Sequence, residues 1–383
     1  MKTTSLHLVT TNEKDEIIVV SKAANIADRK KLVGLLALTL AALLCTTAPS
    51  LIRAEEGGTG HHLPGSGVFL IGVLPAEPGF TVRVSDWFYS GSAESTRPLS
   101  GILQNTAQTN DGIGSIFSAV KNGNAQLPPR VAILASQLQD RVQATDVNLA
   151  LDSVQNISTI TLLYELPWKP LGTRVVTGVS LPFLYVRTTA TVEVRGPKQT
   201  RSARIREDDF GFSDMVVTPV ILGWSAGYFH WSTGLSIYAP TGQYSPNDLA
   251  PLGKNFWTFE PFVAATYLNT KYGQEASLQI AFDANTVNSA TDYHSGCQLN
   301  IEWLLAQHLP YGFSVGVTGF IYQQVTADSG NGATGLAGTY AVGPSIGYTW
   351  KNKLSVSGQW LYEFDVGNRF QGSVASLVAS WTF

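Results

Sequence analysis

The chain has 383 residues and a formal net charge of −3, so it offers no basic field for nucleic acid. Only 14% of its residues are charged, against roughly 25% in an ordinary soluble domain. The mean hydropathy is +0.07, yet residues 55–383 contain no apolar run long enough for a spanning helix. Glycine and aromatic residues are abundant. This combination of weak hydropathy, few charges and many glycine and aromatic residues favours a transmembrane β-barrel.

A secretory signal is predicted near the start of the chain. The basic residues Arg29 to Lys31 precede the apolar run Leu32 to Cys45, which is short for a membrane anchor but suits the core of a signal peptide. We therefore expect residues 1–54 to hold a polar segment and a signal peptide, with a membrane anchor as the alternative. Export of a β-barrel by this route predicts the outer membrane of a Gram-negative bacterium.

Residues 55–78 are polar and rich in glycine, and they are expected to form a periplasmic N-terminal segment ahead of a barrel at residues 79–383. This segment contains the adjacent pair His61 and His62. Two adjacent histidines without a third ligand nearby are more often solvated than metal-bound. The sequence therefore predicts no metal site, and it predicts no cofactor.

Twelve segments of alternating polarity follow, as expected for barrel strands. The second is irregular, because its apolar face switches near Asn156, which suggests a β-bulge or two shorter pieces. The last ends on the aromatic Phe383 with no residue after it, as the closing strand of an outer-membrane barrel does. The segments span residues 80–89, 147–166, 173–187, 213–224, 227–239, 256–268, 275–286, 293–305, 311–323, 337–350, 353–365 and 373–383.

The connections are mostly long after odd-numbered segments and mostly short after even-numbered ones, the pattern of extracellular loops and periplasmic turns. An edge strand in the bilayer would leave backbone groups unpaired at several kcal/mol each, so the strands must close on themselves. The predicted fold is all-β: a transmembrane antiparallel up-and-down β-barrel of about 12 strands.

Two of the long connections are unusual. Residues 90–146 include the stretch Arg130 to Val142, whose apolar spacing suits a short amphipathic helix. This connection is either a structured surface loop or a constriction that folds into the barrel. Residues 188–212 form a predicted loop rich in arginine, which is either solvated or paired with lipopolysaccharide phosphates.

The last strand sets which residues face inward. If Phe383 faces lipid, alternation places a set of polar side chains on the inner face, because a lipid-facing charge costs up to a few kcal/mol. These side chains either line a solute path or close the barrel with a polar network. The candidates for the lumen and substrate path are Arg83, Glu260, Asp283, Glu302, Gln359, Glu363 and Asp365.

Aromatic residues near the strand ends are expected at the membrane interfaces, where amphipathic rings are favoured. Membrane lipids and lipopolysaccharide are accordingly expected partners, together with the outer-membrane assembly machinery. The predicted interface aromatics are Trp257, Trp303, Trp360, Trp381 and Phe383, with Trp87, Phe88, Trp224 and Trp350 as further members.

No enzyme motif stands out, because the sequence lacks GxSxG, HExxH, paired CxxC and P-loop patterns. An outer-membrane hydrolase would need a nucleophile and base such as a Ser–His pair, and nothing marks one. Catalysis is therefore not expected.

Other strings are distinctive in combination: APTGQY at 239–244, FWTFEP at 256–261, NSATDYHSG at 288–296 and EFD at 363–365. Together they resemble the bacterial outer-membrane family of the MetA pathway of phenol degradation, over residues 79–383. The resemblance implies an outer-membrane barrel and, more loosely, passage of aromatic or other hydrophobic compounds. The predicted function is passive uptake of small hydrophobic or aromatic molecules. The alternative is a structural or adhesive surface barrel that acts through its extracellular loops.

Overall fold

The computed structural model describes residues 59–67, 69–75, 78–98, 146–195, 200–330, 336–351 and 353–383. The predictions for residues 1–54 and for a helix at 130–142 fall outside these ranges. None of the described residues forms a helix long and apolar enough to cross a membrane.

The described strands are β1 (Gly79–Pro98), β2 (Asp146–Glu165), β3 (Arg174–Arg195), β4 (Thr200–Phe212), β5 (Met215–Ala226), β6 (Phe229–Ala239), β7 (Thr258–Asn269), β8 (Gln274–Asn285), β9 (Gln298–His308), β10 (Phe313–Gln324), β11 (Gly338–Trp350), β12 (Leu354–Gly367) and β13 (Gln371–Thr382).

Strand β1 closes the sheet into a barrel. It pairs with β13 on one side, from Thr81 opposite Thr382 to Ser92 opposite Gln371, and with β2 on the other. Strands β4 and β5 share one position in the wall, because β5 pairs with the first part of β3 and β4 with its second part. The predicted closed barrel of twelve antiparallel strands is therefore confirmed.

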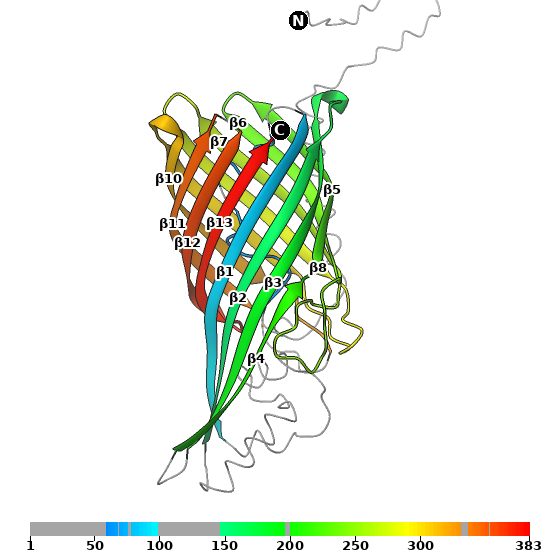
Figure 1. The fold of residues 1–383 in the computed structure, drawn as a ribbon, viewed down its shortest axis with the longest axis vertical. Coiled ribbons are helices and arrows are strands. Elements are labelled where there is room, and N and C mark those ends of the chain that lie inside the picture. Colours follow the sequence, from blue (N-terminus) through cyan, green and yellow to red (C-terminus); the bar gives the residue numbers. More distant parts are fainter. Residues whose placement is uncertain are drawn as a thin grey trace, which may run out of the picture.

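The two ends of the barrel differ. Short turns at residues 166–173, 227–228, 270–273 and 309–312 lie at the end that holds the start of β1 and the C-terminus, which we call the short-turn end (Figure 1). The connections at 240–257, 286–297 and 325–337 are longer and lie at the opposite, long-loop end. The alternation of long and short connections therefore follows the prediction.

At the long-loop end, β1, β2, β3 and β4 run beyond the barrel as a twisted extension (Figure 1). The predicted basic loop at 188–212 is wrong, since β3 and β4 pair there from Phe183 opposite Phe212 to Arg195 opposite Thr200. Alternating small and β-branched residues favour a strand: Ala190 and Val192 are buried, and Ile205 packs against the same cluster.

The predicted bulge in β2 near Asn156 is also wrong, because β2 pairs with β1 and β3 without a shift in register. The apolar face switches because the surroundings of the strand change. Leu149 and Leu151 are buried on the inner side of the extension, whereas Ile160 and Leu162 are exposed on the outside of the barrel. The switch therefore marks where β2 passes from the extension into the barrel wall.

The outer surface of the barrel is apolar, which suits contact with lipid. Of the aromatics predicted at the membrane interfaces, Trp257, Trp360, Trp381 and Phe383 are exposed and Trp303 is half-buried. Two further aromatics were wrongly expected there: Trp87 and Trp224 are buried, with ring N–H groups that donate to Pro64 O and Thr173 Oγ1. Exposed apolar residues on the barrel strands include Phe80, Val84, Phe88, Leu278, Leu305, Val315, Val317, Ile346 and Leu377.

Removal of Phe383 is expected to reduce assembly of the barrel several-fold without much effect on barrels already folded. The backbone N–H of Phe383 donates to Phe80 O over 2.9 Å, but the ring is exposed, with its centroid 6.3 Å from that of Trp381. The yield of heat-modifiable folded protein in outer-membrane fractions measures assembly, and the thermal midpoint of the purified barrel measures stability. Phe383→Trp, which keeps a terminal aromatic, is the control, and normal assembly of the truncated chain would contradict the expectation.

Candidate functional site

The segment before β1 lies inside the barrel. Near the long-loop end, Lys254 Nζ donates to Thr59 O over 2.5 Å. Near the short-turn end, the backbone N–H of Leu70 donates to Glu275 Oε1 over 2.6 Å, and that of Gly72 to Thr266 Oγ1 over 3.0 Å. Residues 59–75, which we call the lumen segment (with residue 68 not described), thus run along the barrel towards β1, and the predicted periplasmic placement of this stretch is wrong.

Glu302 of β9 holds the middle of the lumen segment. Its carboxylate accepts hydrogen bonds from three successive backbone N–H groups, those of Gly65 (2.8 Å), Ser66 (3.2 Å) and Gly67 (2.6 Å). These three residues form a nest, a run of successive backbone N–H groups that point at one anion. Glycine is needed at both ends of this nest. Gly65 has a φ of +79°, and a Cβ atom on Gly67 would lie 2.1 Å from Glu302 Oε2.

Two further predicted lumen residues bind the carbonyl side of the same nest. Gln359 Nε2 of β12 donates to Gly65 O and, over 2.9 Å, to Gly67 O. Arg83 Nη2 of β1 donates to Ser66 O over 3.3 Å. The nest is therefore bonded from three strands that lie apart in the wall.

The two adjacent histidines are buried in the lumen, contrary to the expectation that they are solvated. His61 Nε2 lies 2.9 Å from Asp214 Oδ2, and its Nδ1 lies 2.6 Å from Thr258 Oγ1. His62 Nδ1 lies 2.6 Å from Glu260 Oε2. Their neighbours are about 150 to 200 positions away in sequence, so the pair alone gave no sign of these contacts.

Asp214 lies between β4 and β5 at the long-loop end. Burial alone would raise the pKa of its carboxyl, but the hydrogen bond with His61 and those from the backbone N–H groups of Gly242 and Lys254 outweigh burial and lower this pKa. Asp214 therefore joins the start of the lumen segment to the loop at 240–257. Sequence reasoning placed Asp214 in the predicted segment at residues 213–224 but did not single it out as a candidate for the lumen.

The remaining predicted lumen residues divide into two groups. Asp283 of β8 is fully buried beside Asn300, and Glu363 of β12 is buried but bonds elsewhere, accepting hydrogen bonds from Tyr89 Oη and the Gly372 N–H. Asp365 is exposed, unlike the other candidates for the lumen. Its φ of +52° and the register shift of β12 against β11 break the alternation there.

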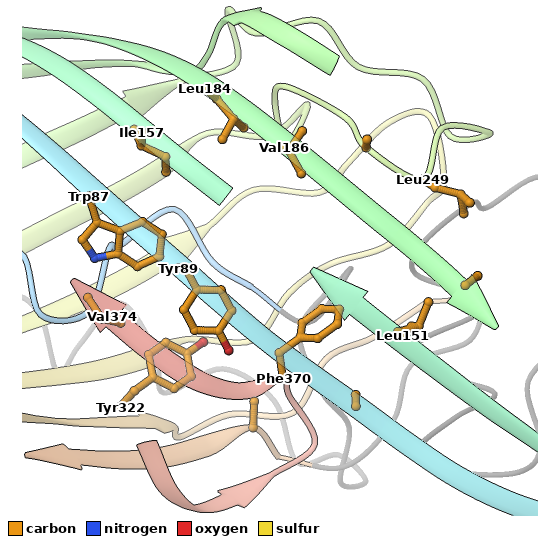
Figure 2. Packing of buried hydrophobic residues seen from close by; sticks show 14 of the residues in the cluster. Trp87, Tyr89, Leu151, Ile157, Leu184, Val186, Leu249, Tyr322, Phe370 and Val374 are labelled. Atoms are coloured by element: carbon orange, nitrogen blue, oxygen red, sulfur yellow. The ribbon is translucent and has the colours of Figure 1, made fainter. Parts of the chain in front are cut away.

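A cavity of about 950 Å³ lies between the lumen segment and the wall formed mainly by β1, β2, β3 and β5. Its lining includes the row Trp87, Ile157 and Leu184, which lie opposite one another on three adjacent strands (Figure 2). Leu249 lines it at the long-loop end and Leu354 at the short-turn end. The cavity therefore runs along the barrel beside the segment.

The cavity wall is continuous with the main cluster of buried apolar residues. Tyr89 stacks on Trp87 with ring centroids 5.7 Å apart, and Val186, Phe370 and Val374 belong to the same cluster (Figure 2). The lumen thus has two sides. Carboxylates and amides on β7, β8, β9 and β12 bond to the segment or to one another, while the side formed by β1, β2 and β3 combines apolar side chains such as Trp87, Ile157 and Leu184 with serine and threonine hydroxyls.

Comparison with known proteins gives the same fold. The family model for the MetA pathway of phenol degradation matches residues 137–378. The crystal structure of the COG4313 outer membrane channel from Pseudomonas putida F1 is similar with a TM-score of 0.52 and 14% identity, over 83% of this chain and 99% of that chain. A FadL homologue from Pseudomonas aeruginosa matches with a TM-score of 0.34 and 10% identity, over 80% of this chain and 90% of that chain. No curated protein matches the sequence.

Glu302→Gln is expected to loosen the lumen segment. The substitution removes the charge and turns a donor towards three N–H groups, at a cost of roughly 1–3 kcal/mol. Hydrogen–deuterium exchange of peptides that cover residues 63–72 should speed up about five- to 150-fold. Asp365→Asn, which changes an exposed acid of the same barrel, serves as the control. Unchanged exchange in Glu302→Gln would show that this carboxylate does not hold the segment.

Proposed function

Because the chain belongs to the family of the MetA pathway of phenol degradation, we propose that it is a channel for passive uptake of small hydrophobic or aromatic molecules. Its closed twelve-stranded barrel is that of a bacterial outer-membrane protein. The observation that carries the proposal is the cavity beside the lumen segment, whose lining reaches towards both ends of the barrel. A polar plug alone would leave no such space.

The chemistry of the cavity wall selects the class of solute. Trp87, Ile157, Leu163 and Leu184 offer apolar and aromatic surface, which favours a solute with little polar area. Burial of about 150 Å² of apolar solute surface is worth about 4 kcal/mol. That is enough for entry from water and weak enough for release at the far end.

The polar candidates have a different part in this proposal. Arg83, Glu260, Glu302 and Gln359 position the lumen segment, and the segment forms one wall of the route. Solute is expected to move through the cavity between the segment and β1 to β3, in contact with its apolar and aromatic side chains. The two alternatives from the sequence, a polar network and a solute path, are thus combined in one barrel.

The lipid partners are proposed from the surface of the extension. Arg204 and Arg206 are exposed on β4, close to the apolar outer surface that carries Phe183 and Phe210. Guanidinium groups form bidentate contacts with phosphate, and the outer leaflet of such a membrane carries lipopolysaccharide phosphates. We propose that these arginines bind lipopolysaccharide. A purely adhesive role of the extension has no such support, and shortening it at residues 188–209 should leave solute uptake intact.

Leu163→Trp is expected to reduce uptake by at least half, because the larger side chain fills the cavity. Uptake of a radiolabelled phenol or benzoate-type probe into proteoliposomes is the measurement, with empty liposomes as background. Leu162→Trp is the matched control, since it adds the same ring to the next residue of β2 on the lipid-facing side. A wild-type flux no greater than that of empty liposomes would refute the channel proposal.

The double variant Arg204→Gln and Arg206→Gln is expected to lose bound lipopolysaccharide and keep solute uptake. Native mass spectrometry of the purified barrel with added lipopolysaccharide measures the bound fraction. Lys169→Gln with Lys271→Gln, two exposed bases at the short-turn end, is the control for the loss of two charges. Equal lipopolysaccharide binding by both double variants would contradict a specific role for β4.

A further inference from the structure

A row of polar side chains crosses the part of the cavity wall that β13, β1, β2 and β3 form. The strand register places one residue from each strand opposite the next, in the order Ser380, Arg83, Thr161 and Ser180. All four residues line the cavity beside the lumen segment. We call this row the polar belt.

Arg83 offers the cavity more hydrogen-bond donors than the protein uses. Among the described residues, its guanidinium donates one hydrogen bond, from Nη2 to Ser66 O over 3.3 Å. A guanidinium carries five N–H donors. The side chain is half-buried and lines the cavity, so the remaining donors are accessible to a solute.

The hydroxyls of Thr161 and Ser180 add a donor next to this guanidinium. Thr161 Oγ1 lies 2.8 Å from Ser180 Oγ, and either hydroxyl can be the donor of that hydrogen bond. Neither hydroxyl makes another hydrogen bond within the part of the chain that the structure describes. Each hydroxyl has one proton, so the hydroxyl that accepts keeps its own proton for a further partner.

Apolar side chains lie on both sides of the polar belt. Towards the short-turn end, Leu163 is two residues from Thr161, which is about 7 Å along β2. Towards the long-loop end, the row of Trp87, Ile157 and Leu184 is about 13 Å away (Figure 2). A solute that contacts the belt with one polar group can therefore keep the rest of its surface against apolar side chains.

Glu302 offsets the positive charge of Arg83. The Ser66 carbonyl accepts from Arg83, and the Ser66 N–H donates to Glu302 Oε1 over 3.2 Å, so the carboxylate lies close to the guanidinium. Glu302 also lines the cavity. An anionic solute at the belt would be repelled by this carboxylate, whereas a neutral oxygen accepts the same hydrogen bonds without that cost.

We propose that Arg83, Thr161 and Ser180 form a binding subsite for the polar end of a neutral aromatic solute, such as the hydroxyl of an aryl alcohol or the carbonyl of an aryl ketone. This inference rests on the proposed channel function and narrows its class of solute. A hydrocarbon leaves the donors of the belt unused, and a carboxylate meets Glu302. Arg83 thus bonds both the lumen segment, at Ser66, and the solute.

Photolabelling of the whole barrel in lipid nanodiscs tests the subsite. Three aryl azides share one ring and differ in one group: para-azidobenzyl alcohol, para-azidotoluene and para-azidobenzoate. Peptide mass spectrometry measures the labelling of cavity-lining residues on β1, β2 and β3 against the free probe concentration. In the wild type, we expect the alcohol to reach half-saturation at a lower concentration than the benzoate.

The variants Thr161→Val and Ser180→Ala each remove one hydroxyl of the belt. Each variant is expected to raise the half-saturating concentration of the alcohol about threefold to tenfold, because one hydrogen bond to the solute is lost. Labelling by para-azidotoluene should change less than twofold, since this probe has no group for the belt. Thr188→Val is the matched control, because Thr188 lines the same cavity eight residues from Ser180 along β3.

Heat-modifiability confirms that each variant is folded, and either belt variant is sufficient for the test. Equal labelling of all variants by the alcohol would overturn the subsite and leave the channel proposal in place, since the solute would still occupy the cavity. Tighter labelling by the benzoate than by the alcohol would also overturn it, because Arg83 would then act as an anion site. Absence of cavity labelling by every probe would overturn the subsite and count against the channel itself.

Discussion

Inside a bilayer, every backbone N–H and C=O group must find its partner within the protein, and the rest of this structure depends on that constraint. Pairing of β1 with β13 meets it by removing the edge of the sheet. Closure then fixes the two faces of every strand, because alternate side chains point to lipid or to the lumen. Apolar residues are turned outward, and many polar residues are enclosed in the lumen, where they need hydrogen-bond partners.

Closure of the barrel buries polar side chains in the lumen, and the lumen segment supplies hydrogen-bond partners for them. Buried carboxylates such as Glu302 need donors, and an extended segment with glycine at Gly65 and Gly67 can present three N–H groups to one carboxylate. The segment is in turn dependent on the barrel, because its own backbone groups find partners in Gln359 and Thr266. Polar groups of the wall and of the segment thus satisfy one another, and the cavity beside the segment keeps apolar side chains such as Trp87, Ile157 and Leu184 in its lining.

Alternation along the strands predicted the fold and much of the wall. It gave the number of wall positions, the closing strand and the inward direction of Glu260, Asp283, Glu302 and Gln359, because these depend only on a period of two. The period of two is interrupted at Asp365, which has a left-handed backbone conformation and is exposed. Alternation failed for the basic stretch at β4, where strand pairing continues beyond the membrane and charge no longer excludes a strand.

The contents of the lumen could not be predicted in the same way. The contacts of His61 and His62 join residues about 150 to 200 positions apart, and no local pattern of sequence encodes them. The sequence does show that the predicted inward acids outnumber the predicted inward bases. These acids need positive charges or hydrogen-bond donors that the strands do not supply. The segment rich in glycine and histidine just before the first strand could have been predicted to supply these donors. An excess of inward acids is therefore a reason to look for an internal occupant, and here the lumen segment provides backbone N–H groups for Glu302 and the His62 imidazole for Glu260.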